Sequence, residues 1–179
     1  MIIFHAIRHT ADEHWHAFKA IYQQSFPVDE QRPIDDIVRL MNEEVRYTVM
    51  ALVDDCNQCI GILTTWGFYT YMYIEHFAIA PAQRAKGYGT IMLCNYMDSL
   101  SIPIVLEVEP PTDNVSQRRI AFYERCGLKL YDYHYIQPAY SSDRSPVTLR
   151  LMGTLVQPNL PQIAHTLHSE VYGIKIPNE

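Results

Sequence analysis

The middle of the chain reads YMYIEHFAIAPAQRAKGYGT from Tyr71 to Thr90. An apolar run typical of a strand ends at Pro81. A short basic turn with Gly87 and Gly89 follows, directly before a predicted helix. Glycines let the backbone wrap closely around a ligand, and the first N–H groups of a helix have no partners within it. Because the positive end of the helix dipole lies there too, the pattern predicts a turn that binds an anion such as a pyrophosphate.

Two other phosphate-binding loops do not fit this turn. A Walker loop requires G-x-x-x-x-G-K-S/T, and no part of the chain matches it. A dinucleotide-binding fingerprint requires G-x-G-x-x-G near the first strand, with an acidic residue about 20 residues later. This chain has one G-x-G, and it lies at mid-chain. Neither of the two corresponding enzyme classes is therefore indicated.

A second motif, FYERCGL, runs from Phe122 to Leu128. It ends a helix predicted over 115–126 and closes on Gly127, a residue typical of the position just after a helix. An apolar run at 104–108, closed by two prolines, predicts a strand between the two motifs.

Together the two motifs resemble those of the GNAT superfamily, the acyl-CoA-dependent N-acetyltransferases. The pyrophosphate loop of that family has the pattern Q/R-x-x-G-x-G/A, and its later motif has the pattern F-Y-x-x-x-G-F/L. The matching residues here are Arg84, Gly87 and Gly89 in the first motif, and Phe122, Tyr123, Gly127 and Leu128 in the second. The motifs cover roughly residues 71–130, and the order of predicted elements extends the resemblance to roughly residues 1–152.

The rest of the chain alternates between strand and helix patterns. A capping box at 10–13 predicts a helix that continues to about residue 24, and Pro33 opens a second helix. Asn114 is the expected N-cap of the helix at 115–126. The further expected elements are strands at 2–8, 47–53, 59–66, 71–79, 128–136 and 147–152, and helices at 87–100 and 159–172.

This order implies the fold class of the family that the chain resembles. We expect an α/β (α+β) protein with a GNAT-like mixed, mostly antiparallel sheet of six to seven strands, helices on both faces and a C-terminal helix. We expect a single acyl-CoA N-acyltransferase domain over residues 1–179. Its core would cover about residues 1–152, and a C-terminal helical extension would cover residues 153–179.

Composition limits the class of protein further. Of the 179 residues 48% are hydrophobic and 19% are charged, which is typical of a soluble globular chain. The net charge of -6 argues against broad binding of nucleic acids or anionic membranes. No apolar run approaches the 18 or so residues of a membrane span, and the first residues lack the pattern of a signal peptide. We therefore expect a cytoplasmic protein with reduced thiols.

The cysteines include a C-x-x-C motif at Cys56 and Cys59. A zinc site would need a second ligand pair at short spacing, which the sequence lacks, and a thioredoxin motif would lie at the start of a helix. This motif lies in a predicted hairpin turn instead. We therefore expect a structural role for it and no metal.

The resemblance implies acetyl-CoA as the co-substrate. In the family the pantetheine arm lies beside the fourth strand, and the pyrophosphate lies on the glycine turn. Ser116 stands at the position, seven residues before Tyr123, where the family often has an asparagine that bonds the CoA arm. Arg119 could neutralise the CoA phosphates. The residues expected to contact acetyl-CoA are Phe77, Ala78, Ile79, Arg84, Ala85, Lys86, Gly87, Tyr88, Gly89, Thr90, Ser116 and Arg119.

The resemblance also suggests which residues move protons. Tyr123 matches the family tyrosine that gives a proton to the departing CoA sulfur. A carboxylate near the fourth or fifth strand is expected to act as the base, directly or through water, and the candidates are Glu75 and Glu107. Strict alternation along the strand places Glu75 on the face of Phe77 and His76 on the opposite face, so His76 is interpreted as structural.

The implied function is an N-acetyltransferase that moves an acetyl group from acetyl-CoA to a primary amine by direct attack in a ternary complex. The alternatives are an acyl-CoA-binding or sensing domain without turnover and a partner subunit. The C-terminal helix would form an interface, such as that of a homodimer, or would close the chain's own core. The acceptor would be a small-molecule or peptide amine, selected by the loops at 26–31 and 137–146. These loops carry Asp29, Glu30, Tyr140 and Asp143.

Overall fold

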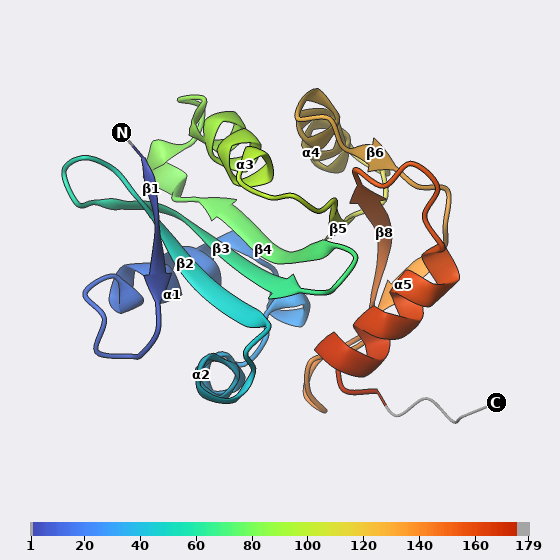
Figure 1. Ribbon diagram of the computed structural model, residues 1–179, viewed down its shortest axis with the longest axis horizontal. Helices are drawn as coiled ribbons and strands as arrows, with labels where there is room; N and C mark the ends of the chain where they lie inside the picture. The colour runs from blue at the N-terminus through green and yellow to red at the C-terminus, as the bar shows by residue number, and fades with distance from the viewer. Residues whose placement is uncertain (1, 175–179) are drawn as a thin grey trace.

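The computed structural model describes residues 2–174 and is built on one mixed sheet (Figure 1). The order of strands is β1-β2-β3-β4-β5-β8-β6, and β7 also pairs with β8. All neighbouring strands are antiparallel except β4 and β5, which are parallel. The strands are β1 (Ile3–Ile7), β2 (Tyr47–Val53), β3 (Cys59–Gly67), β4 (Met72–Ile79), β5 (Ile104–Val108), β6 (Lys129–Leu130), β7 (Tyr135–Gln137) and β8 (Val147–Gly153).

The expected mixed, mostly antiparallel sheet is confirmed, with eight strands in place of the expected six to seven. The difference arises because the strand expected at 128–136 is interrupted. Its two ends, β6 and β7, pair with successive parts of β8. Between them the chain leaves the sheet, and the hydroxyl of Tyr131 donates to the Leu155 carbonyl at 3.1 Å.

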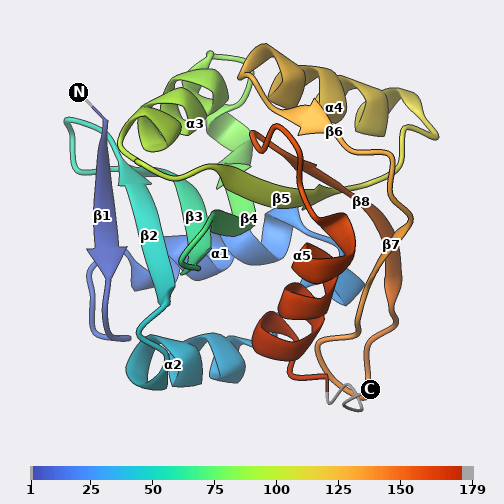
Figure 2. The same ribbon diagram turned by 45° about the vertical axis from the view of Figure 1, so that its right-hand side comes forward.

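Helices cover both faces of the sheet. Figure 2 shows α3 and α4 together above the sheet and α5 on its other side. Buried side chains accordingly form two clusters: α1, α2 and α5 contribute to one, and α3 and α4 to the other. The helices are α1 (Trp15–Ser25), α2 (Ile34–Glu43), α3 (Tyr88–Asp98), α4 (Asn114–Arg125) and α5 (Leu160–Thr166), with the short turns η1 (Val28–Glu30) and η2 (Pro81–Gln83) and the π-helical turn η3 (Leu167–Val171).

The C-terminal helix closes the chain's own core. Its apolar stripe includes Ile163, Leu167 and Val171, and all three are buried in the cluster that α1 and α2 also line. The stripe is therefore not an exposed surface for a partner. Within residues 2–174 no helix has both the length and the apolar character needed to cross a membrane.

Two helices begin at residues other than the expected ones. Helix α1 begins at Trp15, because Asp12 is used in the preceding turn, where it accepts from the His14 N–H at 2.9 Å. The N-cap of α4 is Asp113 and not Asn114. Asp113 accepts from the Ser116 N–H at 2.8 Å, and the Ser116 hydroxyl accepts from the Asp113 N–H at 3.2 Å. These two reciprocal hydrogen bonds form a capping box and identify Asp113 as the cap.

A bulge in β4 changes which side chains share a face. In the pairing with β3, Thr64 lies opposite His76 and Thr65 lies opposite Ile74, so Glu75 is the extra residue. A bulge of this kind places two consecutive side chains on one face. His76 Nδ1 accordingly lies 3.8 Å from the Glu75 carboxylate, and Phe77 packs on the α3 and α4 side. The expectation that Glu75 shares the face of Phe77 is therefore wrong, whereas His76 does lie on the face opposite Phe77.

The sheet opens between β4 and β5. These two strands pair only from Met72 to Ile74 on β4 and from Ile104 to Leu106 on β5. The next residues are Glu75 on one strand and Glu107 on the other. Beyond them the facing backbone groups of the two strands do not pair with each other, so the opening can accept a ligand at the edge of each strand.

Gly153 should be essential to the closed part of the sheet. A Cβ at this position would lie 2.4 Å from the Ile104 carbonyl oxygen and 2.9 Å from the Tyr131 hydroxyl. Gly153→Ala should therefore lower the free energy of unfolding by about 1–3 kcal/mol, measured by urea denaturation. Gly67→Ala is the control, because the nearest atom to its Cβ would lie at an ordinary 3.8 Å. Equal stability of the two variants would contradict this packing.

Candidate active site

A cleft of about 710 Å³ occupies the opening between β4 and β5. Its walls come from β4, the turn after it, α3, β5, α4 and η1. The cleft brings together all three predicted catalytic side chains, Tyr123, Glu75 and Glu107. Ten of the predicted CoA-contact residues also line it: Phe77, Ala78, Ile79, Arg84, Ala85, Gly87, Tyr88, Gly89, Thr90 and Arg119.

The glycine turn presents backbone N–H groups to this cleft. Ala85 and Gly87 have positive φ values of 62° and 80°, which place both residues in the left-handed region. That conformation costs little at glycine but is strained at alanine, so the surrounding turn must hold it. Gly87 is the N-cap of α3, and no side chain caps the helix. The first N–H groups of α3 are therefore available to an anion, as the sequence predicts.

Arg84 braces the turn. Its Nε donates to the Ile79 carbonyl at 3.0 Å, and its Nη2 donates to the Ser25 hydroxyl at 3.1 Å. The guanidinium thus links the end of β4 to α1 while it lines the cleft. Lys86 does not line the cleft, and its Nζ bonds Gln83 at 2.8 Å.

Two residues that were expected to contact acetyl-CoA, Ser116 and Arg119, bond to other side chains of the protein. Ser116 is 3% exposed, and its hydroxyl is part of the α4 capping box. It does not line the cleft. Arg119 does line the cleft, and its guanidinium pairs with Glu109 just beyond β5.

Glu75 is held by a buried arginine. Its Oε1 accepts from Arg32 Nε at 3.0 Å, from Arg32 Nη2 at 2.6 Å and from the Tyr140 hydroxyl at 3.0 Å. Its Oε2 accepts from Trp66 Nε1 at 3.1 Å. Burial alone would raise the pKa of Glu75, but the Arg32 charge and these hydrogen bonds hold it below its usual value. Glu75 is thus an ionised, neutralised carboxylate whose oxygens are already occupied.

Glu107 has the opposite environment. Burial raises its pKa to about 7, although the surrounding tyrosine hydroxyls act to lower it. The hydroxyl of Tyr172 donates to its two oxygens at 2.9 and 3.1 Å. Among the ion pairs of the described residues, none includes Glu107. A carboxyl group of a residue that lines the cleft and titrates near neutral pH can accept a proton there.

Tyr123 lies in the last turn of α4 and is 8% exposed. Burial raises the pKa of its phenol to about 12, so the hydroxyl is protonated at neutral pH. Its backbone carbonyl accepts from the Leu128 N–H at 3.1 Å, and Gly127 has a positive φ of 92°. This glycine closure fixes the helix end that places Tyr123 in the cleft.

Comparison with known proteins identifies the family. Residues 13–128 match the profile of the Acetyltransferase (GNAT) family. The chain belongs to this family. A solved structure from Bacteroides thetaiotaomicron that is assigned to the GNAT acetyltransferases is 33% identical to this GNAT protein. The match covers 97% of this chain and 99% of the other, with a TM-score of 0.90. No curated protein sequence matches the chain.

More distant solved structures share the fold of this GNAT protein. Spermidine N-acetyltransferase from Vibrio cholerae, in a complex with CoA and spermine, is 15% identical with a TM-score of 0.58. That match covers 85% of this chain and 94% of the other. A dodecameric structure of the same enzyme is 15% identical with a TM-score of 0.60, and it covers 86% of this chain and 93% of the other.

The loops expected at the acceptor end lie together. The Asp29 carboxylate accepts from the Ser145 N–H at 2.9 Å, and the Asp29 carbonyl accepts from Gln137 Nε2 at 3.3 Å. His76 also holds this region, because its Nε2 lies 3.0 Å from the Glu30 carbonyl oxygen. Burial lowers the pKa of His76, so the ring is neutral and structural, as expected.

Arg32 and Tyr172 are site residues that the sequence motifs did not indicate, and Tyr140 was expected only in the loop that selects the acceptor, not as a partner of Glu75. Arg32 lies next to Pro33 in a loop, and the two tyrosines lie in the loop after β7 and just after η3. None belongs to a recognisable pattern. They reach the glutamates through contacts between residues 43 to 65 positions apart in the chain.

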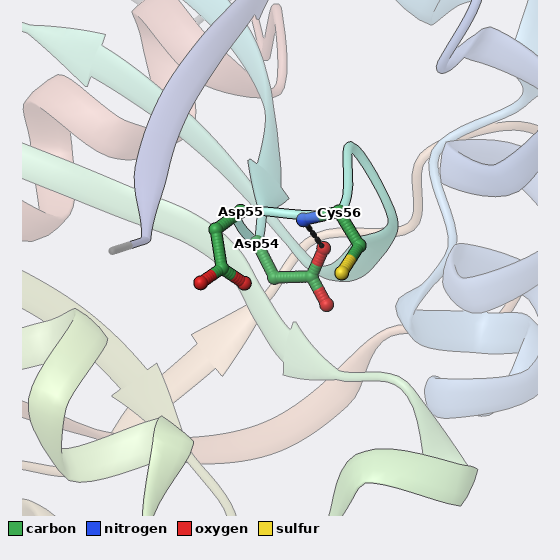
Figure 3. A group of neighbouring side chains, drawn as sticks. All are labelled: Asp54, Asp55 and Cys56. Atoms are coloured by element: carbon green, nitrogen blue, oxygen red, sulfur yellow. Dashed lines mark hydrogen bonds between the residues drawn. The ribbon is translucent and has the colours of Figure 1, made fainter.

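Acidic groups also gather away from the cleft, in the β2–β3 turn at Asp54, Asp55 and Cys56 (Figure 3). The Asp54 carboxylate accepts from the N–H groups of Cys56 at 3.0 Å and Gln58 at 2.9 Å. An aspartate commonly plays this part in a tight turn. Cys56 and Cys59 of the C-x-x-C motif are free thiols.

The glycine turn should lose its affinity for CoA when it carries a negative charge. Gly89→Asp is compatible with the fold, because a Cβ at Gly89 would make ordinary contacts of 3.5 Å and an acidic side chain near a helix N-terminus stabilises the helix. CoA binding, measured by calorimetry, should nevertheless be lost through repulsion of the phosphates. Gly89→Asn is the matched neutral control and should bind at least about tenfold more tightly than Gly89→Asp. Wild-type affinity in Gly89→Asp would contradict the assignment of the turn.

Proposed function

We propose that this GNAT protein is an N-acetyltransferase that moves an acetyl group from acetyl-CoA to a primary amine by direct attack in a ternary complex. The observation that carries the proposal is the raised pKa of Glu107 together with its place in the cleft. This carboxyl group titrates near neutral pH and lines the same cleft as Tyr123, at the point where β4 and β5 part. A base and an acid that share one cleft suit acyl transfer to an amine.

Acetyl-CoA would lie in the opening of the sheet. Its pyrophosphate would contact the N–H groups at the start of α3, and Arg84 would supply positive charge. Its pantetheine arm would lie along Phe77–Ile79, where an N–H group could polarise the thioester carbonyl. Alignment of donor and acceptor in one cleft can contribute about 7–11 kcal/mol to lowering the barrier.

Glu107, and not Glu75, is the better candidate for the base. Glu75 is ionised, but its oxygens accept from Arg32, Trp66 and Tyr140, which leaves it little capacity for a proton. Glu107 has no such counter-charge, and its raised pKa matches the task of removing a proton from an ammonium group near pH 7. Glu107 would first take one proton from the ammonium group, directly or through water. The free amine nitrogen then attacks the thioester carbon, the C–S bond breaks, and the nitrogen releases its second proton as the amide forms.

Tyr123 would support the leaving sulfur. A free thiol has a pKa of about 8.5, so complete transfer of a proton from a phenol with a pKa of about 12 to a thiolate is unfavourable. The hydroxyl would therefore act by donating a hydrogen bond as negative charge develops on sulfur. The proton that finally resides on the thiol is the second proton that the attacking nitrogen releases.

The acceptor is proposed to be a cationic amine, on a small molecule or a peptide. Besides Glu107, the cleft carries Glu30, whose pKa is raised by burial and only partly lowered by Arg119. Binding of a cation close to these groups would offset the cost of burying their charge. The spermidine N-acetyltransferase that shares the fold was solved with spermine, a cationic amine, which is consistent with this class.

The experiment that tests the function is a panel of primary amines, alcohols and thiols, with detection of released CoA thiol and of acetylated product by mass spectrometry. Transfer to amines supports the proposal. Transfer only to hydroxyl or thiol acceptors would refute the amine assignment. Tight CoA binding without turnover on any acceptor would favour a sensing domain instead.

Tyr123→Phe should slow the reaction and leave binding intact, because the ring is kept and only the donor is removed. Loss of one hydrogen-bond donor to a developing negative charge typically costs about 10²–10³ in kcat, so kcat should fall while KM for acetyl-CoA changes only a few-fold. Steady-state kinetics measure both constants. A loss of less than about twofold would reduce Tyr123 to a packing residue.

Glu107→Gln should remove the pH dependence of the reaction near neutrality. In the wild type, kcat/KM should rise as pH passes about 7 and then level off, because only ionised Glu107 accepts a proton. A cooperative transition in urea denaturation should show that the Glu107→Gln variant is folded. The folded pKa lies above the usual value of 4.5, so ionisation of Glu107 lowers the stability of the wild type as pH rises through 4.5–7. At pH 8 the free energy of unfolding of Glu107→Gln should thus be at least as large as that of the wild type. An unchanged pH profile would exclude Glu107 as the base.

A further inference from the structure

The end of the C-terminal helical segment contacts both strands at the place where they part. The Val171 carbonyl accepts from Arg32 Nη2 at 2.9 Å, and the same guanidinium holds Glu75 on β4. The Tyr172 hydroxyl reaches Glu107 on β5 at 2.9 Å. Two consecutive residues are thereby tied, Val171 through Arg32 and Tyr172 directly, to the first residue of each strand beyond the β4–β5 pairing.

The hydrogen bonds at Tyr172 run in one direction when Glu107 is ionised. A phenol has a single hydroxyl proton, and a carboxylate can only accept, so Tyr172 donates to Glu107. The contact between the hydroxyls of Tyr172 and Tyr73, at 3.2 Å, must then have Tyr73 as its donor. Tyr73 is fully buried in the core. Tyr73 thus orients the hydroxyl of Tyr172, which in turn orients the Glu107 carboxylate.

We propose that Tyr172 is a positioning residue for the acetyl transfer, and that its hydroxyl holds the Glu107 carboxylate in the orientation in which it takes the proton from the acceptor amine. The inference rests on the proposed role of Glu107 as the base. It gives the C-terminal helix a part in the active site besides its part in the core, because burial of Leu167 and Val171 fixes the position from which Tyr172 reaches the cleft.

Several other groups face Glu107 and set its ionisation together with Tyr172. Burial acts first and raises the pKa. The like charge of Glu75 raises it further, although Arg32 neutralises that charge, and the tyrosine hydroxyls lower it. The titratable groups that face Glu107 are Tyr73 and Glu75 of β4, Tyr135 of β7, Tyr140 of the loop after β7, and Tyr172.

Tyr172→Phe tests this role, because the ring stays and only the donor to Glu107 is lost. A hydrogen bond to the ionised form favours that form, so its loss should move the rising limb of the pH–kcat/KM profile to higher pH by about one unit. At pH 6 this is about a tenfold loss, and KM for acetyl-CoA should be unchanged. Tyr131→Phe is the matched control, since it removes a buried hydroxyl that donates at 3.1 Å to the Leu155 carbonyl, away from Glu107. Its profile should match the wild type.

A second readout does not depend on activity. Carbon-13 labelling of glutamate side chains allows the Glu107 carboxyl to be titrated by NMR in the free protein, with Glu107→Gln as the assignment control. The titration midpoint should rise in Tyr172→Phe and stay fixed in Tyr131→Phe. If the wild type acetylates no amine, the proposed function fails, while the titration still tests the contact. If transfer occurs and Tyr172→Phe keeps both the wild-type profile and the wild-type midpoint, the positioning role is overturned and the function stands.

Replacement of Tyr172 by 3-fluorotyrosine keeps the ring, the hydroxyl and the packing, so it remains informative if Tyr172→Phe unfolds. Fluorine makes the phenol more acidic and a stronger donor to a carboxylate. The rising limb and the NMR midpoint should both move to lower pH. Movement in the opposite direction, or none, would contradict the proposal.

Discussion

The buried ion pair between Arg32 and Glu75 is the interaction on which the acceptor end of this protein depends. Both side chains are withdrawn from water, with 5% and 0% exposure. Loss of one partner from such a pair typically costs about 3–5 kcal/mol, because the other charge is left buried and uncompensated. Arg32 also donates to the Val171 carbonyl, and Glu75 also accepts from Trp66 and Tyr140. One pair thus joins the α1–α2 loop, β3, β4, the loop after β7 and the C-terminal segment.

The pair also explains how two glutamates in equivalent positions acquire different properties. Glu75 and Glu107 each follow the last residue of their strand that takes part in the β4–β5 pairing. Glu75 receives the arginine and is held below its usual pKa, whereas Glu107 receives tyrosine hydroxyls and titrates near 7. Since Arg32 neutralises Glu75, only a reduced like charge acts on Glu107. The structural carboxylate and the proposed base are therefore separated by environment and not by residue type.

Local patterns in the sequence predict the elements that are proposed to bind the donor. The glycine turn, the helix that ends at Gly127 and the strand between them depend on short-range rules, and the structure brings their residues to one cleft. The bulge at Glu75 could not be predicted in the same way, because it is a property of the register between β3 and β4. Strict alternation along one strand therefore assigned Glu75 to the wrong face.

The choice between the two candidate bases depended on long-range contacts. Sequence alone placed Glu75 and Glu107 near the thioester and could not show that Arg32 neutralises the first or that Tyr172 contacts the second. Those partners come from a loop and a helix end without a motif, and burial by the whole fold sets the pKa of each carboxyl group. Similarly, Ser116 was expected at the CoA arm from its spacing to Tyr123, but a capping box engages its hydroxyl.

The central claim is that the opening between β4 and β5 holds the acyl donor. A crystal structure with a non-reactive thioether analogue of acetyl-CoA tests it most directly. The account predicts that the phosphates lie against the N–H groups of Gly87–Thr90 and that the acyl oxygen lies within hydrogen-bonding distance of a backbone N–H of Phe77–Ile79, with Glu107 open to the acceptor side. An analogue bound outside this opening, or one that leaves the Gly87–Thr90 turn without contact, would contradict the account.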